Sequence, residues 1–140
     1  LLERLLRAGA PVQALGIQAH LAPRSAPFDA ARLARFLREV AGMGLLIEIT
    51  ELDIVDRLLP ADIAARDAEA AVMAADFLRV ALAEPATKML ILWGLSDVQA
   101  WQDQSSFHRR RDVLPPRGHP LDRDMQPKPL WHAIAGALRA

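Results

Sequence analysis

The run Leu46–Ile54 constrains the fold of this chain more than any other segment. Most of its residues are apolar or β-branched, as in a buried strand, yet it carries Glu51 and Asp53 at a spacing of two. A strand points residues i and i+2 to the same face, which predicts both carboxylates on one face, just beyond Ile47 and Ile49. Acids at the end of a buried strand are costly unless they are paired or used. The run therefore predicts a buried strand that leads into a site.

The rest of the chain alternates between helical and strand patterns. Apolar residues recur at helical spacing in four segments, and two further short runs are almost continuously apolar, as in strands covered on both faces. Asp29 is placed to cap the second helix, which is expected to bury Leu33, Phe36, Leu37 and Val40. The expected order is helix 1–8, strand 12–21, helix 30–43, strand 46–54, loop 55–62, helix 64–83, strand 88–95, an irregular segment 102–120 and helix 129–140. Such alternation indicates an α/β fold with a parallel sheet and right-handed crossovers.

The composition narrows the possible partners. The chain is 52% hydrophobic and 24% charged, and its 17 basic residues balance its 17 acidic ones. Nucleic acids and membrane surfaces attract a basic excess, so neither is an expected partner. The sequence has no cysteine, and no apolar run approaches the roughly 20 residues of a membrane span. Because the chain starts at Leu1 in the middle of a helical pattern, we expect the natural N-terminus to lie upstream.

Polar and aromatic residues gather where each predicted strand ends. Ligands bind at these ends in parallel α/β folds, and neighbouring strands lie about 4.8 Å apart, so the side chains should converge on one pocket. A histidine beside a carboxylate can hold it ionised and oriented, and indole rings suit the apolar faces of sugars. No glycine-rich phosphate loop follows any strand. The pattern favours a carbohydrate site made by Gln18, His20, Glu51, Asp53, Trp93 and Trp101.

Five of these six residues, all but Gln18, also have a structural interpretation. Glu51 is equally the kind of acid that pairs with an arginine at a strand end, and a lone His20 is more often a satisfied structural histidine. Asp53 is suited to capping a loop. The two tryptophans are of the type that usually lies in a core.

The remaining charged and titratable residues favour structural roles. Glu48 is expected to face away from Glu51, toward the helices, and to pair with a helix arginine. Three basic residues without interleaved aromatics, Arg109–Arg111, indicate a solvated loop. No metal site is expected, because ligand-like spacing is absent from His108, His119 and His132.

Four motifs occur in one order over nearly the whole chain: Leu-Gly-Ile-Gln-Ala-His-Leu (15–21), Ile-Thr-Glu-Leu-Asp-Ile (49–54), Trp-Gly-Leu-Ser-Asp-Val-Gln-Ala-Trp (93–101) and Pro-Leu-Asp-Arg-Asp-Met-Gln-Pro-Lys-Pro (120–129). Together they resemble glycoside hydrolase family 10, the endo-1,4-β-xylanases. The resemblance implies the C-terminal portion, about strands six to eight with their helices, of a TIM (β/α)8 barrel. Residues 1–140 would then form an incomplete family 10 catalytic domain.

The resemblance also implies roles. It implies retaining hydrolysis of xylan or xylo-oligosaccharides without a cofactor, with Glu51 as the nucleophile. His20 would hydrogen-bond Glu51, and Asp53 would complete that network. Gln18 and Trp93 would border the sugar beside the cleavage point, and Trp101 would wall the same pocket.

The second catalytic group of the family has no counterpart here. The general acid/base is a Glu on strand four within a Trp-x-x-x-Asn-Glu motif, which this sequence lacks. Retaining chemistry needs two carboxyls about 5–5.5 Å apart that flank the scissile bond. The isolated chain is therefore expected to be inactive, with the remaining N-terminal barrel strands as its partner. A secreted or periplasmic location of the intact enzyme is expected from the resemblance.

Two other functions remain open at this point. One is another (β/α)8-barrel β-glycanase that cleaves cellulose or mannan. The other is a non-catalytic partial-barrel module for carbohydrate binding or assembly, although its outer strands would expose unpaired edges.

Overall fold

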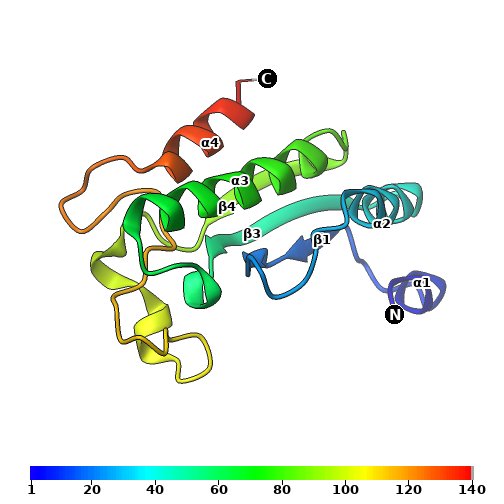
Figure 1. Cartoon of the computed structure of the whole chain (residues 1–140). Helices are drawn as coiled ribbons and strands as arrows, with labels where there is room; N and C mark the ends of the chain where they lie inside the picture. The colour runs from blue at the N-terminus through cyan, green and yellow to red at the C-terminus, as the bar shows by residue number, and fades with distance from the viewer. Residues whose placement is uncertain (140) are drawn as a thin grey trace.

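The computed structural model describes residues 1–139, in which a parallel sheet lies against a layer of helices (Figure 1). The central strand β3 (Leu46–Ile54) pairs on one side with β1 (Ala14–Ile17) and β2 (His20–Leu21), and on the other with β4 (Thr87–Leu92). Every pairing is parallel. The helices are α1 (Leu2–Arg7), α2 (Ala30–Gly42), α3 (Ile63–Ala81) and α4 (Pro129–Ala137), with short 3-10 turns at Asp56–Leu58, Asp97–Gln99 and Trp101–Gln104. The predicted order of helices and strands is confirmed.

Local capping explains where the two longest helices begin. The Asp29 carboxylate accepts the Arg32 N–H at 2.8 Å, as the sequence predicts, and Asp62 does the same for Ala65 at the start of α3. Pro129 occupies the first turn of α4, where its missing N–H costs nothing.

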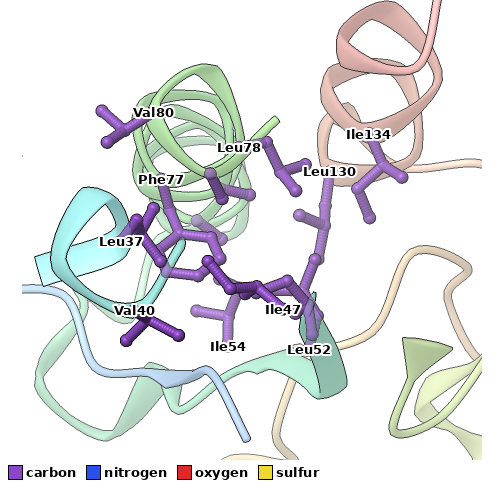
Figure 2. Packing of buried hydrophobic residues seen from close by; sticks show 14 of the residues in the cluster. Leu37, Val40, Ile47, Leu52, Ile54, Phe77, Leu78, Val80, Leu130 and Ile134 are labelled. Atoms are coloured by element: carbon purple, nitrogen blue, oxygen red, sulfur yellow. The ribbon is translucent and has the colours of Figure 1, made fainter. Parts of the chain in front are cut away.

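The hydrophobic core lies between the sheet and three helices. In Figure 2, Ile47, Leu52 and Ile54 of β3 face Phe77 and Leu78 of α3, with α2 and α4 closing the two sides. Two expectations fail at the margins of this core. Phe36 of α2 lines an open groove beside α3 instead of packing inside, and the last helix ends at Ala137, short of the predicted 129–140. No helix among residues 1–139 has the length and apolarity of a membrane span.

A bulge in β3 changes which residues share a face. Ile49 pairs with Leu90 and Leu52 with Leu92, so β3 advances three residues while β4 advances two. On the other side, β3 takes four residues from Ile49 to Asp53 while its neighbour takes three, from Ile17 to His20. One extra residue in β3 thus shifts the alternation of its side chains.

Because of the bulge, two predictions about this strand are wrong. Ile47 and Ile49 pack in the helix-covered core, and so do Leu52 and Ile54 beyond the bulge. Glu51 and Asp53 therefore point to the opposite, open face instead of lying above Ile47 and Ile49. Glu48 also lies on the open face, and it forms no ion pair within residues 1–139, so its predicted pairing in the helix layer is wrong.

The predicted strand 12–21 is divided in two. Ala19 adopts a left-handed backbone conformation with φ 59°, which few residues with a side chain tolerate. Pairing with β3 stops at Ile17 and resumes at His20. This kink keeps Gln18 and His20 at the end of β3, across from its acids.

Candidate active site

His20 joins the two acids of β3. Its Nε2 lies 3.2 Å from Glu51 Oε2, and its Nδ1 lies 2.8 Å from Asp53 Oδ1. Both bonds can be donated at once only by the doubly protonated ring, whereas a neutral ring keeps one of them. The ring thus fixes the orientation of Glu51 relative to Asp53.

Asp53 is fully enclosed and its oxygens are occupied. Besides His20, it accepts hydrogen bonds from Trp101 Nε1 and, at 3.1 Å, from Gln102 Nε2. Its side chain has no exposed surface. A buried carboxylate with this many hydrogen-bond donors is fixed in place and in turn orients the side chains that donate to it.

Glu51 keeps one side open. Its side chain is 19% exposed and accepts from Gln18 Nε2 at 3.3 Å as well as from His20. Two donors leave further lone pairs on the carboxylate free to meet a ligand. Of the two acids, Glu51 is the one that a ligand can reach.

Aromatic rings surround His20. Trp93, half exposed just after β4, meets the His20 ring edge-on with centroids 6.2 Å apart, and Trp101 lies 5.0 Å away on another side. The structure thus brings together all six residues that the sequence singles out: Gln18, His20, Glu51, Asp53, Trp93 and Trp101.

Two neighbours of the site were missed by the sequence reasoning. Gln102 donates to Asp53 and also, at 3.3 Å, to the Ile54 carbonyl, which ties the loop after β4 to the end of β3. His108 packs on Trp101 with centroids 4.6 Å apart. Gln102 directly follows Trp101 in the sequence, but no spacing rule marks either residue.

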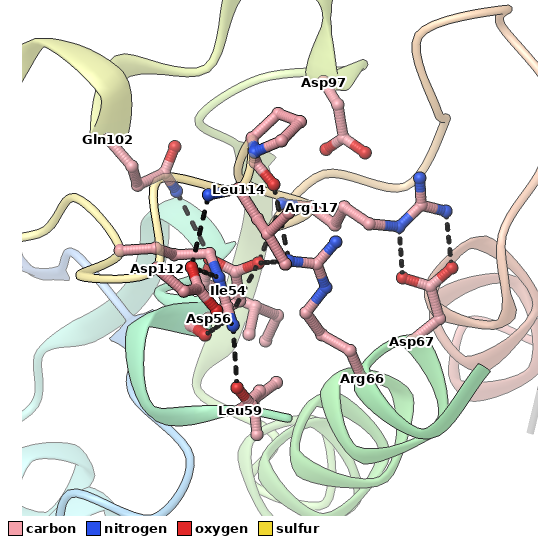
Figure 3. Close-up of polar contacts among 12 residues, drawn as sticks. Ile54, Asp56, Leu59, Arg66, Asp67, Asp97, Gln102, Asp112, Leu114 and Arg117 are labelled. Carbon is pink, nitrogen blue, oxygen red and sulfur yellow. Dashed lines mark hydrogen bonds and ion pairs between the residues drawn. The ribbon is translucent and has the colours of Figure 1, made fainter. Parts of the chain in front are cut away.

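A buried ionic cluster lies behind the site, around Asp56 (Figure 3). The Asp56 carboxylate lies 3.5 Å from Arg66 and 3.7 Å from Arg110, and it accepts the Arg117 N–H at 3.0 Å. Burial raises the pKa of Asp56, and the neighbouring positive groups offset only part of that effect. Arg110 also donates to the Leu59 carbonyl at 3.0 Å.

The prediction that Arg109–Arg111 form a solvated loop is wrong for Arg110. Arg109 and Arg111 are exposed as expected, but Arg110 is buried and holds the carbonyls of the 3-10 turn after β3. The segment 102–120 is irregular, as predicted, and this arginine fastens it beside the site.

A second buried pair joins Asp97 to the start of α4. Lys128 Nζ lies 2.7 Å from Asp97 Oδ2, and the His119 N–H donates to Asp97 Oδ1 at 3.0 Å. Burial alone would raise the pKa of Asp97, but His119 and the Lys128 ammonium outweigh it and hold that pKa below its usual value.

Among residues 1–139, the open face offers no second carboxyl placed for retaining hydrolysis. Asp53 shares a strand with Glu51, and its oxygens are taken by His20, Trp101 and Gln102. Within the described part of the chain, no cluster of three His, Cys, Asp or Glu side chains has the arrangement of a metal site. The site thus presents one oriented, accessible carboxylate, that of Glu51, beside the rings of Trp93 and Trp101.

Comparison with known proteins agrees with this geometry. The family model described as "Glycosyl hydrolase family 10" matches residues 1–137. Endo-1,4-beta-xylanase 1 of Humicola insolens is 31% identical over 134 residues, which covers 94% of this chain and 29% of that protein. Endo-1,4-beta-xylanase 5 of Pyricularia oryzae is 29% identical over 140 residues, with coverages of 98% and 32%. The chain therefore spans about a third of the length of these curated relatives.

Solved structures match the fold closely. Xylanase 10B from Thermotoga maritima superposes with a TM-score of 0.83 at 26% identity, covering 99% of this chain and 40% of that one. Xylanase 10B from Thermotoga petrophila, solved in complex with xylobiose, gives the same TM-score and identity, with coverages of 99% and 39%. The fold is thus the C-terminal portion of a (β/α)8 barrel.

Proposed function

This chain belongs to glycosyl hydrolase family 10, and we propose that it supplies the nucleophile half of a retaining endo-1,4-β-xylanase. In this proposal Glu51 attacks the anomeric carbon of a xylose unit in xylan and forms the glycosyl-enzyme. A Glu on the N-terminal part of the barrel protonates the leaving group and then activates water. No cofactor is required. Because xylan is a large polymer, we place the assembled enzyme outside the cytoplasm.

The observation that carries the proposal is the different environment of the two acids on β3. Glu51 is partly exposed and oriented by Gln18 and His20, as a nucleophile must be. Asp53 is enclosed and bound by three side chains. It acts through His20 and Trp101 by fixing their positions, and is a positioning residue.

The aromatic residues fit the proposed substrate. Trp93 presents an exposed ring next to His20, and Trp101 is locked by its N–H bond to Asp53. Rings held in this way bind the apolar face of a pyranose. Gln18, whose Nε2 donates to Glu51, still offers its amide oxygen to a sugar hydroxyl. The xylobiose complex of the Thermotoga petrophila relative is consistent with a xylo-oligosaccharide ligand.

The proposal is tested by completing the barrel. The 140-residue chain, which covers 40% of Thermotoga maritima xylanase 10B, is fused behind the N-terminal part of that protein, so that the fusion regains the barrel strands that this chain lacks. We expect the fusion to hydrolyse xylan in preference to cellulose and mannan, and the isolated chain to show no turnover. Preferential cleavage of cellulose or mannan would indicate a different β-glycanase.

A matched pair of variants assigns the role of Glu51. Glu51→Gln should lower kcat of the fusion by at least about a thousandfold, because the amide cannot form the covalent intermediate. Glu48→Gln, on the same strand and the same open face, should retain activity to within about threefold. An active Glu51→Gln fusion would contradict the proposal.

A further inference from the structure

Asp97 lies midway between the two tryptophans of the site. It follows Trp93 by four residues and precedes Trp101 by four, and its side chain is fully buried. Its backbone N–H donates to the Leu121 carbonyl at 3.0 Å, while Leu121 donates to the Leu95 carbonyl at 3.0 Å. The turn that connects the two tryptophans is therefore fastened to a distant segment of the chain.

Lys128 forms a buried ion pair with the Asp97 side chain. Its ammonium donates to Asp97 at 2.7 Å and to the Arg117 carbonyl at 2.6 Å, and its backbone N–H donates to the Pro120 carbonyl at 2.9 Å. Lys128 is also the residue that immediately precedes α4. The start of α4 is thus coupled to the turn between the tryptophans by a buried charge pair.

The His119 ring packs against the start of the same turn. A Cβ added at Gly94, the residue after Trp93, would lie 2.5 Å from His119 Nε2, so the backbone rests directly on this ring. His119 is buried, and neither of its ring nitrogens has a hydrogen-bond partner within residues 1–139. Its Nδ1 lies 3.5 Å from Asp97 Oδ1, an electrostatic contact too long for a good hydrogen bond.

The segment that carries His119 is wedged between two strand ends. The Gly118 carbonyl accepts the Ile54 N–H at 3.0 Å, and a Cβ at Gly118 would lie 2.0 Å from the Ile54 carbonyl oxygen. The close approach is possible only because Gly118 has no side chain. The segment therefore links the end of β3, which carries Asp53, to the turn after Trp93.

We propose that Asp97, held by Lys128 and backed by His119, is a positioning residue that sets the directions of Trp93 and Trp101. The description of these rings as a sugar pocket rests on the proposed function. A buried ion pair is often no more stabilising than apolar residues of similar volume, but it fixes a geometry that apolar packing leaves adjustable. Here the fixed geometry is that of the two rings.

The direct test is fluorine NMR of the 140-residue chain labelled with 5-fluorotryptophan. The chain has three tryptophans, which single Trp→Phe variants assign. Asp97→Asn keeps an acceptor for the His119 N–H but loses the charge pair, and Lys128→Met removes the cation. Both variants should shift or split the resonances of Trp93 and Trp101.

Asp67→Asn is the matched control. It breaks another largely buried ion pair, with the Arg117 guanidinium at 2.8 and 2.6 Å. Only the Arg117 backbone carbonyl, which this substitution does not change, contacts Lys128. It should lower the midpoint of urea unfolding while leaving both resonances in place. Unchanged resonances in a folded Asp97→Asn chain would overturn the proposal, as would equal shifts in the Asp67→Asn control.

Kinetics of the completed barrel give a second readout. Asp97→Asn should raise KM for xylan about tenfold with a smaller change in kcat, whereas Asp67→Asn should leave KM unchanged. An unchanged KM in Asp97→Asn would also overturn the proposal. If the unsubstituted fusion binds and cleaves no xylan, the proposed function fails, and the fluorine spectra still decide whether Asp97 positions the two rings.

Discussion

The two faces of the central sheet differ in almost every respect. On the covered face, Ile47, Ile49 and Ile54 have no exposed surface and pack against three helices. On the open face, apolar side chains of similar size retain between 41% and 51% of their exposure: Leu46, Met89, Ile91 and Trp93. Exposed apolar patches of this kind mark binding surfaces.

The difference shows which face of the barrel wall this chain covers with its own residues. The helix-covered core is closed within the chain, whereas the open face corresponds to the barrel interior, which the other strands of the family fold cover. The bulge in β3 marks the change between them, because it turns the strand's last acids from the covered face to the open one.

The largest expected effect comes from placing an acid on the covered face just beyond the bulge. Leu52 is 2% exposed and packs in the core, so Leu52→Asp would bury an unpaired carboxylate. Burying an unpaired acid costs several kcal/mol, so we expect loss of the cooperative urea transition followed by circular dichroism.

Met89→Asp, on the open face of β4, is the matched control, because Met89 is 41% exposed. It should retain the transition. A Leu52→Asp chain that unfolds like the Met89→Asp chain would show that the strand does not face the core beyond the bulge as described.

A pair of isoleucine truncations measures the two faces directly. Ile49→Ala on the covered face should destabilise the chain by about 2–5 kcal/mol, whereas Ile91→Ala on the open face should cost less than about 1 kcal/mol. Both are measured by urea unfolding of the isolated chain. In the completed barrel, Ile91→Ala should become costly as well. Equal costs in the isolated chain would mean that its open face is already covered.

The open face should also drive association of the isolated chain. Its apolar patch and the unpaired edges of β1 and β4 favour self-association at micromolar concentration. Ile91→Lys should shift the sedimentation profile toward monomer, while Val72→Lys, at an isolated exposed position on α3, should not. A monodisperse wild-type monomer would contradict this expectation.

The smallest expected effect concerns pH. The folded-state pKa of Asp97 is below its ordinary value of 3.8, so this group stabilises the fold above that pH and the stabilisation is lost as pH falls through the lower folded value. Asp97→Asn should therefore flatten the acid limb of the stability profile.

The contribution of Asp56 to stability changes with pH in the opposite direction. Its folded-state pKa lies above 3.8, so its contribution is greatest at low pH and declines as pH rises through the raised value. Asp56→Asn should remove that decline. Urea midpoints measured across the acid range check both signs, and slopes that change in the same direction in the two variants would contradict them.

The sequence predicts the architecture well because its signals are local. Helical periodicity, the Asp29 cap and apolar runs lie within single elements, and the convergence of His20, Glu51 and Trp93 follows from parallel strands ending at one edge. These features need no knowledge of distant contacts.

The features that the sequence does not predict depend on distant partners. The bulge exists only in the register of β3 with both neighbours. A strict period of two therefore wrongly put Glu51 on the same face as Ile47 and Ile49, and Glu48 on the opposite face from Glu51. Arg110 looks solvated within its basic run, and its burial follows from carbonyls contributed some fifty residues earlier. Gln102 gains its role only when the loop folds over Asp53.

The central claim is that Glu51 is the nucleophile, and covalent labelling tests it most directly. The completed barrel is treated with a 2-fluoro-xylobioside, which traps the glycosyl-enzyme, and the labelled peptide is identified by mass spectrometry. We predict a single label on Glu51, absent in Glu51→Gln. A label on Asp53 or on any other carboxylate would contradict the assignment.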